Sequence, residues 1–335
     1  MKKIIIAIHG LGNKPSAEIL EESWLNAIHE GLDQINKNRK NIPVKMVYWA
    51  DVSYPQPLDA EIDDSEDPLF LKEPYTASPS TAEQHERKSR RLYILRFIEN
   101  HLDQFFLKKN LKETFPEIMT MLMERYFSDL DTYYSEECIA LQNENYSAKA
   151  AIQERLRSIL QEYADHEILL ISHSMGSIVA FDVLWAASES FSVRTFVTMG
   201  SPLGLPPIIA RIFQAQKDLL PQLKQPRAPD CIWPHWYNIS DRRDTVALDH
   251  TLRDDYAVNV KGLKVVDLLV TNDYQINGES NPHKSYGYLR TPEVARIIDT
   301  FLTDRRDEGI FGKCNLILGN ITASTRRLWK KVTPG

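Results

Sequence analysis

Residues 167–177, with the sequence Glu-Ile-Leu-Leu-Ile-Ser-His-Ser-Met-Gly-Ser, decide the fold of this chain. An apolar run ends there at Ser174, and a helix-like segment follows at once. Strand, sharp turn and helix in this order form the setting in which a serine can be a nucleophile at the tip of the turn. Such a turn crowds the positions two places before and after the serine, and Ser172 and Gly176 are both small. We therefore predict that Ser174 is a nucleophile; the alternative is a turn of small residues whose serine only caps the helix.

The segments around this stretch follow the rhythm of a parallel α/β sheet. Residues 3–8 form a nearly continuous apolar run, which is typical of a parallel strand covered on both faces. Ser16 is expected to cap a helix that runs to about residue 35, and a second strand is expected over residues 44–49. Strand, helix and strand predict a parallel α/β fold. Further strands are expected at 193–199, 231–239 and 264–270, and further helices at 148–163 and 292–302.

The composition is that of an ordinary soluble globular protein. Hydrophobic residues make up 43% and charged residues 26% of the 335 residues, and the net charge of −6 gives no sign of nucleic-acid binding. The three cysteines, Cys138, Cys231 and Cys314, lie far apart, so we expect neither a metal site nor a disulfide framework, and no cofactor. The apolar run after Met1 is too short for a signal peptide, and no run reaches the roughly 18 residues of a membrane span. We expect a cytoplasmic location.

Two segments stand apart from the core, which we expect to comprise residues 1–54 and 146–305. Residues 55–145 begin with a proline-rich acidic stretch and continue with helical periodicity, so they predict an inserted, mainly helical cap that roofs an acyl pocket. Residues 306–335 form a basic tail that could be an amphipathic helix on an anionic membrane. The alternative for the tail is a helix docked on the domain, with its charges in solvent.

A serine hydroxyl is a poor nucleophile at neutral pH, so it needs a base and an acid that orients the base. The loop after the strand at 231–239 offers Asp241 and Asp244 as acids. His250 and His283 follow this loop and are the candidate bases. For either aspartate, the alternative is a salt bridge with a neighbouring arginine or an Asx turn.

Ester chemistry also needs two N–H donors for the oxyanion of the tetrahedral intermediate. We expect one to be the amide of Met175, directly after the nucleophile, and the other to lie in the loop at residues 9–12, His-Gly-Leu-Gly. This loop could instead be a plain glycine turn or a phosphate-binding loop. It lacks both the phosphate-loop sequence and the third glycine of a dinucleotide fingerprint.

Taken together, these elements resemble an α/β-hydrolase of the lipase and esterase type. The matching stretches are His-Gly at 9–10, the serine turn at 172–176, Gly-Ser-Pro at 200–202, the Asp244 loop and His283. The resemblance implies a doubly wound, mostly parallel sheet with a lid over the site. The departures are Ser172, where the commoner pattern has glycine, and the long insertion.

The resemblance also selects among the candidates. The sequence Asp-Thr-Val that begins at Asp244 resembles the Asp-Pro-Val of many esterases, which favours Asp244 over Asp241. In such proteins the acid and the histidine usually lie on loops separated by a strand, and this favours His283 over His250. The His-Gly motif implicates the amide of Leu11 as the second oxyanion donor.

The function implied is a serine hydrolase that cleaves carboxylic esters through an acyl-enzyme intermediate, with a small-molecule or lipid ester as substrate. The alternatives are a membrane-associated phospholipase or lysophospholipase, which the basic tail and the apolar cap would favour, and an acyltransferase that uses the same residues. A non-catalytic binding protein on a hydrolase fold is a further alternative.

Overall fold

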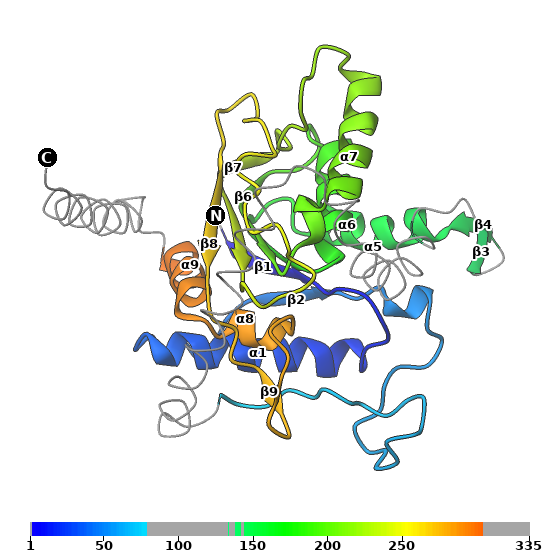
Figure 1. Ribbon diagram of the computed structural model, residues 1–335, viewed down its shortest axis with the longest axis vertical. Helices are drawn as coiled ribbons and strands as arrows, with labels where there is room; N and C mark the ends of the chain where they lie inside the picture. The colour runs from blue at the N-terminus through cyan, green and yellow to red at the C-terminus, as the bar shows by residue number, and fades with distance from the viewer. Residues whose placement is uncertain (1, 79–132, 134–137, 142–143, 304–335) are drawn as a thin grey trace, which may run out of the picture.

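The computed structural model describes residues 2–78, 133, 138–141 and 144–303, and its centre is a six-stranded sheet (Figure 1). The strand order is β2-β1-β5-β6-β7-β8, and every neighbouring pair in it is parallel. This confirms the predicted parallel α/β architecture. The strands are β1 (Lys3–Ile8), β2 (Val44–Val47), β5 (Glu167–His173), β6 (Val193–Met199), β7 (Ile232–Ser240) and β8 (Val265–Leu269).

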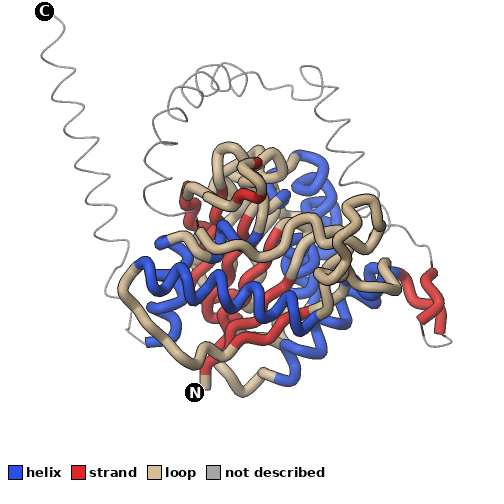
Figure 2. Tube along the Cα trace, turned by 90° about the horizontal axis from the view of Figure 1, so that it is seen from below, coloured by secondary structure: helices blue, strands red, loops and turns tan. Residues whose placement is uncertain are grey.

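Helices cover both faces of this sheet, as Figure 2 shows. One face is covered by α1 (Ala17–Gln34), α8 (Ser285–Leu289) and α9 (Pro292–Thr303), and the other by α5 (Ala148–Glu162), α6 (Gly176–Ala186) and α7 (Pro206–Leu219). Because successive side chains of a strand point to opposite faces, Ile4 and Ile6 of β1 pack in the core beside α5 and α6, whereas Ile5 packs in the core beside α1. Both cores are apolar, which explains the continuous hydrophobic runs of the strands.

Local signals set the helix boundaries as the sequence predicts. The side chain of Ser16 accepts a hydrogen bond from the N–H of Ile19 and begins α1, and Ser147 caps α5 in the same way through the N–H of Ala150. The segment between β6 and β7 contains the 14-residue helix α7. The shorter elements are η1 (Ala50–Val52), η2 (Pro202–Gly204), β9 (Gln275–Ile276) and β10 (Glu279–Ser280).

The insertion is described only in part. Residues 55–78 form the proline-rich loop that the sequence predicts, and β3 (Cys138–Leu141) pairs with β4 (Glu144–Ser147) in an antiparallel hairpin at the periphery of the molecule, where a helical cap was expected. The predicted cap helices between residues 81 and 134 lie outside the described residues, apart from Tyr133, and so does the tail at 306–335. In the part that the structure describes, no helix has the length and apolar character that a membrane crossing requires.

The parallel strands bring the loops of the candidate site together. The loops after β1, β5, β6 and β7 all leave the carboxyl edge of the sheet, and the loop before α8 returns to the same edge. Ligands of open α/β sheets bind at this edge.

Candidate active site

Ser174 lies at the tip of a strained turn between β5 and α6. Its φ is 53°, in the left-handed region that non-glycine residues rarely adopt. The turn is fixed by its backbone, since the N–H of Ser174 donates to the carbonyl of Met199 (3.0 Å) and its carbonyl accepts from the N–H of Ser177 (2.9 Å). Strain of this kind is concentrated at functional sites, where the surrounding structure maintains it.

The structure shows why the residues two places before and after Ser174 are small. A Cβ atom on Gly176 would lie 2.5 Å from the carbonyl oxygen of His9, so a larger residue would push α6 away from the end of β1. Ser172 is fully buried, and its hydroxyl donates to the carbonyl of Val197 (3.1 Å). The serine that replaces the commoner glycine is therefore satisfied within the core.

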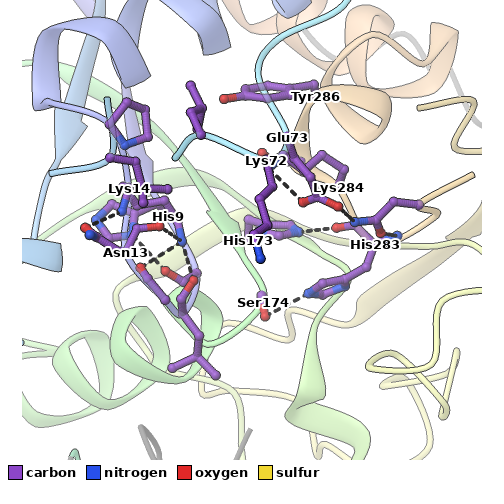
Figure 3. Close-up of a pocket in the computed structure, with 18 of the residues that line it drawn as sticks. His9, Asn13, Lys14, Lys72, Glu73, His173, Ser174, His283, Lys284 and Tyr286 are labelled. Carbon is purple, nitrogen blue, oxygen red and sulfur yellow. Dashed lines mark hydrogen bonds and ion pairs between the residues drawn. The ribbon is translucent and has the colours of Figure 1, made fainter. Parts of the chain in front are cut away.

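Three of the predicted site residues form one hydrogen-bonded chain (Figure 3 shows its first two members). Nε2 of His283 lies 3.0 Å from Oγ of Ser174, and Nδ1 lies 2.9 Å from Oδ2 of Asp244. A carboxylate only accepts hydrogen bonds, so the Nδ1 proton points to Asp244 and Nε2 is left to accept the proton of the serine. This is the order of contacts that an activated serine requires.

The carboxylate of Asp244 is buried but well supplied with donors. Its Oδ2 accepts a hydrogen bond from the hydroxyl of Tyr288 (2.7 Å), and its Oδ1 accepts one from the N–H of Val246 (2.9 Å). Burial raises the pKa of Asp244, but the charge of His283 and the hydrogen bonds from His283, Tyr288 and Val246 outweigh it, so the net pKa is below its usual value. Asp244 is therefore ionised at neutral pH.

Gly200 has no side chain, and this makes room for the contact between Asp244 and His283. Its φ is 53°, and a Cβ atom there would lie 2.7 Å from Oδ2 of Asp244 and 3.0 Å from Nδ1 of His283. The Gly-Ser-Pro stretch after β6 is thus explained by a close approach as well as by a turn.

The side chain of His173, next to Ser174, contacts the backbone of His283, the candidate base. Its Nε2 lies 2.6 Å from the carbonyl oxygen of His283, and the centroids of the two rings are 4.7 Å apart (Figure 3). Burial, followed by the charge of His283, holds the pKa of His173 well below its usual value. A neutral ring whose Nε2 carries the proton donates this hydrogen bond. Sequence reasoning did not find this contact or that of Tyr288, since both depend on the fold.

Asp241 and His250, the less favoured candidates for the acid and the base, make other contacts. Asp241 forms an ion pair with Arg243 and accepts a hydrogen bond from the N–H of Asn272 (2.7 Å), which is the salt bridge considered as its alternative role. The carbonyl of His250 accepts from the side chain of Asn238 (3.2 Å), and burial lowers the pKa of its ring. Among the described residues, His283 is the histidine that lies within hydrogen-bond distance of Ser174.

The predicted oxyanion donors lie at the two loops that border Ser174. Met175 is the N-cap of α6, where the backbone N–H groups and the helix dipole favour negative charge. Leu11 lies in the loop after β1, and this loop lines the same cavity as Ser174. Within the described residues, neither amide N–H donates a hydrogen bond.

The loop that contains Leu11 is braced from both sides. The N–H of Trp49 donates to Nε2 of His9 (3.0 Å), and the indole N–H of Trp49 donates to the carbonyl of His9 (3.0 Å). Burial, then the charge of Lys14, lowers the pKa of His9 to about 3, so the ring stays a neutral acceptor. The ammonium of Lys14 binds the carbonyl of Leu11 and that of Gly12 (2.9 Å).

A cavity of about 990 Å³ opens over Ser174. Its apolar lining includes Leu58, Phe70 and Leu71, so the described part of the insertion does border the site. The rest of its lining mixes apolar and polar residues, and Figure 3 shows several charged side chains around it. The described residues contain no group of three or more His, Cys, Asp or Glu side chains suited to a metal ion.

One comparison with known proteins gives a match. The family model described as "PGAP1-like alpha/beta domain" matches residues 109–283, which is just over half of the chain and ends at His283. No curated protein matches the chain. The matching family is of the α/β-hydrolase type, and together with the parallel sheet it confirms that the chain is a member of the α/β-hydrolase superfamily.

Proposed function

This chain belongs to the PGAP1-like alpha/beta domain family, and we propose that it is a serine hydrolase that cleaves carboxylic esters through an acyl-enzyme intermediate. The observation that carries the proposal is the hydrogen-bonded chain from Asp244 through His283 to Ser174. The family supports hydrolase chemistry in general. The nucleophile and the ester bond are our inference from the geometry.

The proposed reaction begins when Oγ of Ser174 attacks the acyl carbon while Nε2 of His283 takes the serine proton. The amides of Met175 and Leu11 donate to the oxyanion of the tetrahedral intermediate. As that intermediate collapses, His283 gives its proton to the leaving alcohol and the acyl group stays on Ser174. Water then attacks the acyl-enzyme with His283 as base, and a second collapse releases the carboxylic acid and restores Ser174.

The buried carboxylate of Asp244 would act through His283. It accepts the Nδ1 proton, which orients the ring, and its negative charge stabilises the imidazolium that forms at each transfer. Acyl transfer to another alcohol would use the same residues and differs only in the acceptor. Product analysis in water, with and without an added alcohol, separates the two reactions.

The test combines a fluorophosphonate probe with hydrolysis of 4-nitrophenyl butyrate. We expect the probe to label Ser174, and we expect Ser174→Ala, His283→Ala and Asp244→Asn to lower kcat/KM by on the order of 10³-fold or more, because the residues act as a unit. The matched control is His250→Ala, which should stay within a few-fold of wild type. Full activity in Ser174→Ala, or an inactive His250→Ala beside an active His283→Ala, would refute the assignment.

A further inference from the structure

A short segment of the insertion borders the cavity and is fastened to the core. We call residues 71–78 the strap. The hydroxyl of Tyr274 donates to the carbonyl of Pro74 (2.7 Å), and Nη1 of Arg290 donates to the carbonyl of Thr76 (2.6 Å). Arg290 is itself 1% exposed and also binds Asp273. These buried anchors fix the path of the strap beside the site.

The strap carries one cation, Lys72, to the cavity. Lys72 lines the cavity together with Ser174, and Figure 3 shows its side chain extending into this space. The next residue, Glu73, is already bound by Lys284 (3.1 Å) and by the side-chain amide of Asn281 (2.6 Å). Among the described residues, Lys72 forms no ion pair, and its side chain is exposed.

The charges around the cavity do not balance. Lys14 lies on the other side of the cavity, where backbone carbonyls bind its ammonium (Figure 3). Arg243 is paired with Asp241, and Lys284 with Glu73. Outside these two ion pairs, the charged side chains of the described lining are the cations Lys14 and Lys72 and the carboxylate Glu279, which gives an excess of one positive charge. An excess of positive charge in a concave site favours an anionic ligand.

We propose that the ester cleaved here has a negative charge on its leaving alcohol, as a phosphate or a carboxylate, and that Lys72 binds this charge. The inference rests on the proposed function and adds the class of substrate to it. Leu58, Phe70 and Leu71 of the insertion line the same cavity and can contact an acyl chain, so we assign the charge to the leaving alcohol. An exposed ion pair stabilises a complex only slightly, whereas a charge-assisted hydrogen bond stabilises it more. We therefore expect Lys72 to give the anionic esters about a 5- to 30-fold higher kcat/KM than the neutral ester.

The experiment compares butyrate esters that differ in the alcohol alone. These are 1-butyryl-glycerol, which is neutral, 1-butyryl-glycerol 3-phosphate, the butyryl ester of glyceric acid, and butyrylcholine, which is cationic. We expect kcat/KM to be highest for one of the two anionic esters, and comparing these two shows whether phosphate or carboxylate is preferred. Lys72→Gln should lower kcat/KM for the anionic esters about 5- to 30-fold and change that for 1-butyryl-glycerol less than 2-fold. Added salt should weaken the preference, because it screens the charge.

Lys264→Gln is the matched control. Lys264 is exposed and precedes β8, so it lies at the amino ends of the strands, whereas the candidate site lies at their carboxyl ends. It should leave every ester unchanged. Two results overturn the inference and leave the proposed function intact. One is a wild-type kcat/KM for the neutral ester equal to that for the anionic esters. The other is a Lys72→Gln variant whose kcat/KM falls equally for neutral and anionic esters.

A second measurement is independent of turnover. Calorimetric binding of the anionic and neutral esters to Ser174→Ala should show the same preference, and Lys72→Gln in that background should remove it. If no ester is hydrolysed by the wild type, the proposed function fails, and this binding measurement alone decides whether the cavity takes an anion. Equal binding of the two esters overturns the inference.

Discussion

The hydroxyl of Tyr288 is the most informative single group to remove. It donates to Oδ2 of Asp244 (2.7 Å) and accepts from the N–H of Asp241 (3.0 Å), and the residue is fully buried. Tyr288→Phe keeps the ring and deletes both hydrogen bonds at once.

The magnitude follows from the two bonds. The bond to ionised Asp244 is charge-assisted and should contribute about 1.5–3 kcal/mol, and the N–H of Asp241, left buried without an acceptor, costs about 1–3 kcal/mol. We expect the free energy of unfolding to fall by about 3–5 kcal/mol at pH 7. Tyr256→Phe is the matched control, because Tyr256 is also buried but donates to the neutral carbonyl of Leu203 (2.9 Å), and should cost about 1 kcal/mol.

The two bonds also predict how this loss depends on pH. The pKa of Asp244 is lowered in the folded protein, so its ionised form stabilises the fold above about pH 4, and this contribution is lost as the pH falls through the folded pKa. Removing a donor raises that folded pKa. The difference in the free energy of unfolding between wild type and Tyr288→Phe should therefore be largest at neutral pH. It should become smaller in acid and approach the cost of leaving the Asp241 N–H without an acceptor.

Urea unfolding followed by tryptophan fluorescence measures both effects. A loss at pH 7 no larger than that of Tyr256→Phe, or a loss that is the same at pH 3.5 and pH 7, would show that Tyr288 does not stabilise the Asp244 carboxylate.

Two further variants probe the surroundings of the candidate triad. His173→Phe keeps a ring but deletes the hydrogen bond to the carbonyl of His283; kcat for 4-nitrophenyl butyrate should fall about 10- to 100-fold with KM nearly constant, and His173→Gln, which retains a donor, should recover part of it. Gly200→Ala places a methyl group 2.7 Å from Oδ2 of Asp244 at a φ of 53°; it should destabilise the protein by about 1–3 kcal/mol and lower ester hydrolysis more than stability alone explains. Wild-type kinetics in either variant would contradict the close contacts described here.

The sequence predicts the sheet and the serine turn well because their signals are local. The apolar runs of β1 and β5, the cap at Ser16 and the small residues around Ser174 each report a constraint within a few positions of the chain. The choice of Asp244 over Asp241 also rests on a local signal, the Asp-Thr-Val sequence, and the structure brings Asp244 to His283.

The contacts that the sequence does not predict are made between distant segments. Tyr288 lies in a five-residue helix with no periodicity to show which face is buried, and His173 meets the backbone of a residue 110 positions later. The path of the strap has no hydrophobic pattern of its own, since it is fixed by hydrogen bonds from Tyr274 and Arg290. Positions such as these depend on tertiary packing, which propensity and spacing do not encode.

The anchoring of the strap by late residues bears on the order in which the site is assembled during synthesis. Its bonds from Tyr274 and Arg290 span 200 and 214 residues, and Ser174 and its candidate base are 109 residues apart. At about 5–20 residues per second, a ribosome makes residue 283 roughly 5–20 s after residue 174. During that interval the growing chain has the turn but neither its base nor the fastened strap. Under the proposed mechanism, a chain in this state has a serine without its base, and the site is complete only once synthesis has passed residue 290.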